Sequence, residues 1–268
     1  MSKLGTFAKR FYVVLILILV YVPLVMAAIF SFNVPPHRGD LTFNWNGFSL
    51  RGFDELFTQE IGLAFLNSLL IGLTSAGGVV VLSLLTTYAL WRQRNKIFKL
   101  AVDGTANIPL INPDIVSAIA LAVTFSFLFG TLGISEGGML RAIVSHIVVI
   151  LPYGLIVMYP RSVKFDKSLL EASYDLGYGP IRTWFKTYFR HMLPIIVATF
   201  VISLTLSFDD FILVRMVAKV ETIGTRLYSS NIKNWTLMLG TILLVLTVSG
   251  SAGFALWKGR VKKHEKIR

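Results

Sequence analysis

Six stretches of this sequence are apolar and long enough to cross a lipid bilayer as helices, and this feature limits the fold more than any other. The hydrocarbon core of a bilayer is about 30 Å thick, so a spanning helix needs about 20 predominantly apolar residues. Of the 268 residues, 54% are hydrophobic and only 15% are charged, which is unusual for a soluble domain. The predicted spans cover residues 11–33, 63–91, 100–131, 138–160, 193–214 and 235–257.

Basic residues are concentrated in alternate segments between these spans. Most of the 26 lysine and arginine residues fall before residue 11, within residues 92–99, within residues 161–192 or after residue 257. In a six-span protein these four segments lie on one side of the membrane, and the positive-inside rule makes that side cytoplasmic. The sequence therefore predicts an all-α, multi-pass membrane protein with both termini in the cytoplasm and one transmembrane domain over residues 1–268. The net charge of +12 is explained by this topology and does not report the charge of a substrate.

The second predicted span is rich in small residues. Small side chains let the backbones of neighbouring membrane helices approach closely. We therefore expect this part of the span to pack against other helices, through Gly72, Ser75, Ala76, Gly77 and Gly78.

Several reactive or ligating groups are missing from the chain. It has no cysteine, which excludes disulfides, thiolate metal sites and cysteine nucleophiles. No G-x-x-x-x-G-K-[ST] phosphate loop occurs, so we do not expect this chain to bind ATP in that way. The four histidines have no metal-ligand spacing, and His146 is expected to be a hydrogen-bonded packing residue rather than a proton relay. We expect no catalytic residue, no metal site and no cofactor in this chain.

The segment between the fourth and fifth predicted spans is polar and carries turn signals. Ser168 followed by Glu171 fits a capping box, in which two side chains satisfy the first amides of a helix. This helix is predicted to end near Leu176, and Gly177 is suited to a left-handed cap. A second helix is predicted to begin at Pro180, because proline is favoured in a first helical turn. The sequence thus predicts two short helices joined by a sharp turn.

The second of these helices is predicted to be amphipathic. A helix lying in the membrane interface would explain its apolar stripe and its cations. That interpretation leaves the first helix unexplained, because its small residues beside a sharp turn form a knob that fits a groove on another protein. The stripe consists of Ile181, Trp184, Phe185, Tyr188 and Phe189, and the cations are Arg182, Lys186 and Arg190.

This knob carries a family resemblance. Glu171-Ala172-Ser173 followed by Gly177 resembles the EAA…G motif of the permease subunits of ABC importers, and Asn67-Ser68 also resembles that family. Ser173 stands where a second alanine is usual, and Pro194 lies four residues beyond the usual place of the motif's proline. In that family the loop is a cytoplasmic coupling helix that docks into a cleft of the ATPase subunit. The resemblance therefore implies ATPase-coupling roles for Glu171, Ala172, Ser173, Asp175 and Gly177.

Three carboxylates are predicted to lie at membrane depth, where ionisable residues are costly and often functional. They are Asp114 in the third span and the adjacent Asp209 and Asp210 at the end of the fifth. Asn112-Pro113-Asp114 is equally typical of a helix start, where an acid interacts favourably with the helix dipole. Asp209 and Asp210 could instead mark the outer end of the span or pair with Arg215. Two nearby carboxylates also suit a dication or polycation, and we favour that interpretation.

The residues around these acids carry a second resemblance. Ser207-Phe208-Asp209-Asp210 and Asn112-Pro113-Asp114-Ile115-Val116 resemble the second permease subunit of spermidine/putrescine importers. The resemblance implies a substrate path that includes Asp114, Ser207, Asp209 and Asp210. It also implies an aromatic residue in the external loop, whose nearest match is Phe53 where tryptophan is expected. Phenylalanine is a weaker cation–π partner than tryptophan.

Together, these resemblances imply one transmembrane subunit of an ATP-driven polyamine importer in the bacterial cytoplasmic membrane. They imply four kinds of neighbour: a second, homologous permease chain, a dimer of ATPase subunits that bind ATP and Mg²⁺, an extracytoplasmic substrate-binding protein, and membrane lipid. No nucleic-acid partner is expected. An ABC permease for a metal ion, sugar or organic anion is the alternative. A channel would leave the knob unexplained, and an intramembrane enzyme would need a nucleophile and base or metal ligands within reach of one another.

Overall fold

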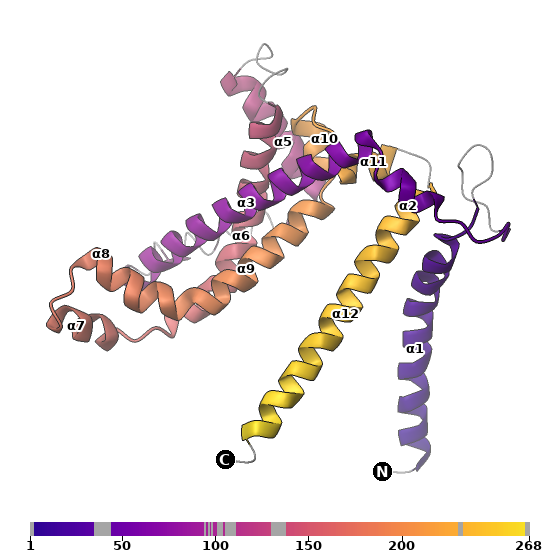
Figure 1. The fold of residues 1–268 in the computed structure, drawn as a ribbon. Helices are drawn as coiled ribbons and strands as arrows, with labels where there is room; N and C mark the ends of the chain where they lie inside the picture. The colour runs from indigo at the N-terminus through magenta and orange to yellow at the C-terminus, as the bar shows by residue number, and fades with distance from the viewer. Residues whose placement is uncertain are drawn as a thin grey trace. The chain divides into compact units, whose positions relative to one another are not determined.

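The computed structural model describes residues 3–34, 44–93, 111–129, 138–229 and 233–265, together with residues 95, 97, 99, 100 and 104. This part of the chain is almost entirely helical and contains no extended strand, and Asn33 and Phe48 form an isolated antiparallel bridge. The elements in chain order are α1 (Lys3–Phe30), α2 (Arg51–Leu56), α3 (Gln59–Arg92), α5 (Asp114–Phe129), α6 (Gly138–Val163), α7 (Ser168–Asp175), α8 (Pro180–Thr183), the π-helix η2 (Trp184–Phe189), α9 (Arg190–Asp209), α10 (Ile212–Val217), α11 (Ile223–Ser229) and α12 (Asn234–Glu265) (Figure 1).

Four of the described helical segments are long and apolar enough to cross a membrane. They are Phe11–Phe30, Glu60–Arg92, Gly138–Val163 and Pro180–Phe208. The first three coincide with predicted spans, whereas the fourth only overlaps the predicted span 193–214, because it begins well before residue 193 and α9 ends at Asp209. Two shorter apolar helices, Asp114–Leu128 and Asn234–Ser249, lie within the other two. The all-helical, apolar architecture that the sequence predicts is therefore confirmed. Most of the first part of the third predicted span lies outside the described residues.

The chain divides into two compact units, of which the first comprises Met1–Gly62 and Ser229–Arg268. In this unit α12 packs against α1 and α2. Asn33 follows α1, and its side chain bonds to the backbone of Asn44 and Asn46, each at 2.8 Å. The side chain of Asn234 donates a hydrogen bond of 2.5 Å to the carbonyl of Asn33. These bonds fix the turn after α1 to the first residue of α12.

The second unit, Leu63–Tyr228, contains the close helix packing that the small residues predict. Here α6 packs against α9, and α10 packs against α5 and α6. A Cβ added to Gly72 would lie 2.9 Å from Leu204, and one added to Gly78 would lie 2.5 Å from Ile147. Gly77 has no such neighbour within 4 Å. Two of the predicted glycines therefore lie where α3 meets α9 and α6.

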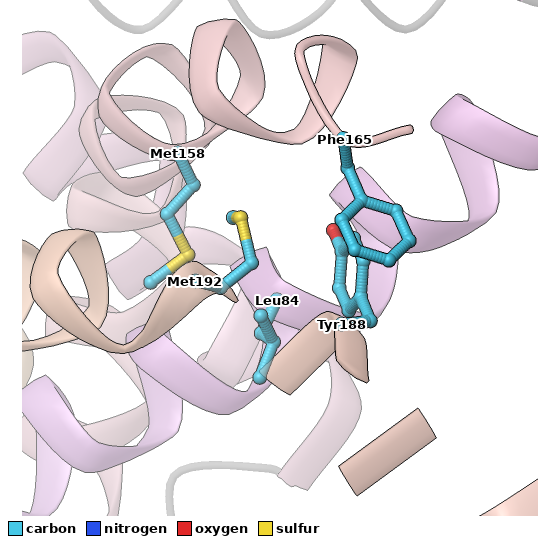
Figure 2. Close-up of a cluster of buried hydrophobic side chains, with 5 residues drawn as sticks. All are labelled: Leu84, Met158, Phe165, Tyr188 and Met192. Carbon is cyan, nitrogen blue, oxygen red and sulfur yellow. The ribbon is translucent and has the colours of Figure 1, made fainter. Parts of the chain in front are cut away.

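One buried cluster joins the ends of α3, α6 and the segment that contains η2 and α9. Figure 2 shows its five members, Leu84, Met158, Phe165, Tyr188 and Met192. The rings of Phe165 and Tyr188 meet edge to face, with centroids 5.3 Å apart. The hydroxyls of Tyr188 and Ser162 lie 2.8 Å apart, and that of Ser162 donates to the carbonyl of Thr87 at 3.1 Å. The phenol is thus both packed and hydrogen-bonded, as buried tyrosines usually are.

The predicted capping box at the start of α7 is wrong. Ser168 is the first helical residue, Lys167 occupies the cap position, and no side chain of the cap residue bonds to the helix amides. The carboxylate of Asp166 instead accepts a hydrogen bond from the amide of Ser168 at 3.0 Å. In a capping box the side chain of Glu171 would bond to this amide, and the carboxylate of Asp166 takes its place.

Two other turn predictions are confirmed. Gly177 has a φ of +79°, the left-handed conformation that glycine adopts without strain. Pro180 occupies the first turn of α8. The helix before the turn ends at Asp175, close to the predicted Leu176.

The prediction of one apolar stripe after Pro180 is wrong in its detail. Tyr188 is completely buried, whereas Ile181 is 75% exposed and Phe185 is 55% exposed. The chain is helical from Pro180 to Asp209, and residues 184–189 form a π-helix within this stretch. A π-helix has a wider turn than an α-helix, so the side chains that follow it point in directions that an α-helical period does not predict.

Candidate functional site

A cavity of about 320 Å³ brings together two of the predicted membrane acids, Asp114 and Asp210. Asp114 is the first residue of α5, and Asp210 directly follows α9. Tyr153 of α6 and Phe211 contribute aromatic rings to the wall. The remaining lining residues are apolar and come from α6, α9 and α10: Val149, Ile150, Leu206 and Ile212. The cavity therefore combines two carboxylates with aromatic and aliphatic surface.

Asp114 reaches the cavity because α5 begins beside it. Pro113 precedes the helix, and its carbonyl accepts a hydrogen bond of 2.9 Å from the amide of Val116. The helix start that Asn112-Pro113-Asp114 predicts is thus confirmed. An acid in a first turn is favoured by the helix dipole. Because Asp114 also lines the cavity, the two interpretations of this residue are compatible.

Asp210 has a structural partner as well as a place in the cavity wall. Its Oδ1 accepts a hydrogen bond of 2.9 Å from the amide of Leu213, in the first turn of α10. Such a bond satisfies one of the amides that a helix start leaves unpaired. The carboxylate is therefore held in place by α10, which itself packs on α5 and α6.

Asp209 and Ser207 lie in different situations. The backbone of Asp209 ends α9, and its side chain lies outside the described part, so its predicted role stays a prediction. Ser207 is buried, with its Oγ 3.3 Å from that of Ser75 on α3. It also lines a narrow pocket that shares Asp210 with the larger cavity and extends to His146 of α6.

A segment after α10 is fastened to α3 by two polar residues. The side-chain amide of Asn67 donates to the carbonyl of Glu221 at 3.0 Å, and Oγ of Ser68 accepts from the amide of Ile223 at 2.9 Å. The sequence points to the Asn67-Ser68 pair but gives no indication of its partners, which lie more than 150 residues away. Long-range pairs of this kind have no local signal in one sequence.

Phe53 belongs to the first unit and lies in α2. Its ring is 43% exposed and meets that of Phe57 edge to face at 4.9 Å. An exposed aromatic face is what a cation–π contact requires.

The predicted ATPase-coupling residues divide into exposed and buried groups. Glu171, Ala172 and Asp175 of α7 are exposed. Ser173 is buried, and its hydroxyl lies 3.2 Å from that of Thr183 in α8. Ser173 thus holds the two short helices together, while the neighbouring residues form the free surface of α7.

Electrostatics adds detail at both ends of this loop. The amide of Ser168 stabilises the ionised carboxylate of Asp166 and lowers its pKa below the ordinary value. Beyond the turn, the guanidinium of Arg182 lies 4.4 Å from the ring centre of Tyr178, and the ammonium of Lys186 lies 5.1 Å from it. The exposed side of the second short helix is therefore cationic.

Among the residues that the structure describes, no three histidine or acidic side chains lie close enough together to hold a metal ion. Two carboxylates beside aromatic rings are suited to organic cations, which carboxylates attract and aromatic faces accommodate.

Comparison with known proteins gives a consistent result. Residues 80–263 match the family described as binding-protein-dependent transport system inner membrane component. The chain is 31% identical to a spermidine/putrescine transport system permease protein PotC homolog of Mycoplasma pneumoniae, over 95% of this chain and 91% of that protein. It is 32% identical to the spermidine/putrescine transport system permease protein PotC of Escherichia coli strain K12, over 85% of both chains. It is 25% identical to the putrescine transport system permease protein PotI of the same strain, over 92% of this chain and 91% of that protein.

These matches cover most of the chain, including the helices that form the cavity and the loop that carries α7. The chain therefore belongs to the family of inner membrane components of binding-protein-dependent transport systems, and it is a transport permease rather than an enzyme.

Proposed function

We propose that this chain is a transmembrane subunit of an ATP-driven importer of polyamines such as spermidine and putrescine. The cavity shared by Asp114 and Asp210 carries the proposal. The relatives are named as spermidine/putrescine permeases, which supports polyamines as the substrate class.

The cavity suits a flexible molecule with more than one ammonium group. Its volume lies in the range of small-molecule sites, and most of its wall is apolar. Methylene chains contact such a wall favourably, whereas an ammonium leaving water needs an opposite charge nearby. Asp114 and Asp210 provide that charge, and the rings of Tyr153 and Phe211 add cation–π attraction. A neutral sugar or an organic anion would leave the two carboxylates unmatched.

Six spans and one transmembrane domain are our proposal for the whole chain. Four helices of spanning length support it, as do the apolar helices α5 and α12 within the other two predicted spans. The alternation of basic segments supports a cytoplasmic position for both termini and for α7.

We assign α7 to contact with the ATPase subunits, where ATP and Mg²⁺ would be bound. Glu171, Ala172 and Asp175 are exposed there, next to the sharp turn at Gly177. The cluster around Tyr188 connects the segment that follows this turn with α3 and α6. A close-packed cluster transmits displacement with little deformation. Movement of the ATPase would therefore tilt these helices together and change access to the cavity.

The proposed assembly contains a second, homologous permease chain and an external substrate-binding protein. The family description, which names a dependence on binding proteins, supports the latter. Many exposed apolar side chains along α1, α3, α5 and α9 are consistent with lipid or a second permease around this chain.

The proposal is tested by uptake of labelled spermidine and putrescine in cells that lack their own polyamine importers. The chain is expressed with its neighbouring transport subunits, and Asp210→Asn is compared with wild type. Asparagine can still accept the hydrogen bond from Leu213, so the variant removes charge while keeping the cap of α10. Asp54→Asn removes an acid from α2 and serves as the matched control.

We expect uptake by wild type and by the control, and a loss of about tenfold or more in Asp210→Asn, because one charge-assisted contact contributes about 1.5–3 kcal/mol. An assembled complex that hydrolyses ATP but takes up no polyamine would refute the substrate and favour another solute.

A further inference from the structure

His146 is a buried titratable residue that the proposed mechanism does not use. It lies on α6 with its side chain completely buried. Its Nδ1 lies 2.7 Å from the carbonyl oxygen of Ala142, one turn earlier in the helix. A carbonyl can only accept, so Nδ1 carries the hydrogen of this bond. In the neutral ring Nε2 is then a bare acceptor.

Nε2 has no hydrogen-bond partner among the residues that the structure describes. His146 lines a narrow pocket together with Ser68, Ser207 and Asp210, and no part of this pocket is wide enough for water. The hydroxyl of Ser207 lies against that of Ser75. A buried acceptor without a donor is unfavourable, and it is uncommon in native proteins.

Asp210 joins this pocket to the larger cavity, because it lines both. From α9 and the segment after it, two acceptors act on the imidazole, the carboxylate of Asp210 and the backbone carbonyl of Ser207, although neither lies within strict hydrogen-bond geometry of Nε2. The other wall contains Ser68 of α3 and Thr222. The bonds from Asn67 to Glu221 and from Ser68 to Ile223 hold this wall closed. If helix movement separated these few bonds, the pocket would open towards Asp210.

We propose that His146 is a further substrate-binding residue, whose Nε2 accepts a hydrogen bond from an ammonium group of the cargo when the pocket opens. This inference rests on the proposed function. One ammonium occupies the cavity between Asp114 and Asp210, and the other end of the same molecule enters the inner pocket. There Asp210 supplies charge, and His146 supplies the acceptor whose lone pair is unused. A cationic N–H donor, such as an ammonium group, can interact with both the carboxylate of Asp210 and Nε2 of His146.

The test uses the complete transporter in proteoliposomes, with its binding protein at saturation. Spermidine uptake and ATP hydrolysis are measured in the same vesicles for His146→Leu and His146→Gln. Leucine fills a similar volume without an acceptor, whereas the amide oxygen of glutamine can occupy the place of Nε2. Ser145→Ala, one residue away and also buried, is the control for disturbance of α6.

We expect His146→Leu to lower spermidine uptake per complex about tenfold or more, with assembly and ATP hydrolysis unchanged. His146→Gln should restore at least half of the wild-type rate, and Ser145→Ala should match wild type. A purely structural role would instead reduce assembly and ATP hydrolysis in both His146 variants.

Two results would overturn the inference while leaving the function intact. One is normal spermidine uptake by His146→Leu when Asp210→Asn has lost it. The other is an equal loss of assembly, hydrolysis and uptake in the leucine and glutamine variants. If wild type itself transports no polyamine, the proposed function fails and this inference fails with it.

Discussion

Asp210 shows how one residue can satisfy a structural and a functional interpretation at once. Its carboxylate caps α10 through the amide of Leu213 and also lines the cavity with Asp114. A carboxylate has about four lone-pair positions, so the hydrogen bond from Leu213 does not by itself prevent contact with a cation. Loss of charge and loss of the cap are therefore separable by substitution.

The turn after α7 depends on a single glycine. Gly177 has a φ of +79°, which costs about 1–2 kcal/mol for a residue with a side chain. Gly179, two residues later, has a φ of −68°, and both positions have open space where a Cβ would be. We therefore predict that Gly177→Ala weakens the turn and reduces recovery of the ATPase with the purified chain, while Gly179→Ala does not. Equal recovery for the two variants would contradict this explanation.

The start of α7 depends on Asp166. Because the hydrogen bond from Ser168 lowers the pKa of Asp166 below 3.8, the carboxylate stabilises the folded loop at pH values above 3.8. This contribution is lost as the pH falls through the lowered pKa. At pH 7 we predict faster amide exchange in residues 168–171 for Asp166→Ala than for wild type. Asp166→Asn, which keeps an acceptor, should lie between them, and identical exchange in all three would refute the cap.

At the scale of elements, α3 and α6 approach closely because Gly154 of α6 has no side chain to separate them. A Cβ added to Gly154 of α6 would lie 2.8 Å from Val79 of α3, and valine has little freedom to move aside. We predict that Gly154→Ala destabilises the purified chain by about 1–3 kcal/mol, measured as a lower midpoint of thermal unfolding in detergent. Gly77→Ala, which meets nothing within 4 Å, should leave the midpoint unchanged or slightly raised.

The long helices are predictable because a run of about 20 apolar residues by itself indicates a membrane-spanning helix. Turn residues such as Gly177 and Pro180 were predictable for the same local reason. The π-helix at Trp184–Phe189 was not, because nothing in the side-chain period distinguishes it from an α-helix. The predicted capping box is wrong because the carboxylate of Asp166 bonds to the amide of Ser168, which that pattern assigns to the side chain of Glu171.

The candidate site was only partly predictable. Asp114 and Asp210 were singled out because charges in apolar runs are rare, but no spacing indicates that they share a cavity. Tyr153 and Phe211 gave no signal, because aromatic residues are common in such helices. His146 is predicted to be a hydrogen-bonded packing residue. Its Nδ1 is hydrogen-bonded to the carbonyl of Ala142, but its Nε2 has no hydrogen-bond partner within the described part of the chain. Such pairings depend on helix contacts that one sequence does not specify.

At the scale of the whole molecule, the proposed function depends on contact between α7 and a separate ATPase chain. Glu171 is exposed on α7, where its loss should disturb no internal contact of the fold. We predict that Glu171→Ala lowers co-purification of the ATPase and polyamine uptake together, while the variant chain accumulates normally in the membrane. Asp54→Asn serves as the control. Uptake at the wild-type rate in Glu171→Ala would contradict the assignment of α7.

The central claim is that Asp114 and Asp210 together recognise a polycation on its way through the membrane. The most direct test is spermidine uptake by the reconstituted transporter with both residues changed to asparagine, with ATP hydrolysis measured in the same vesicles. We predict that spermidine uptake by the double variant falls by more than about tenfold, while the complex still assembles and hydrolyses ATP. Uptake by the double variant at the rate of wild type would contradict it.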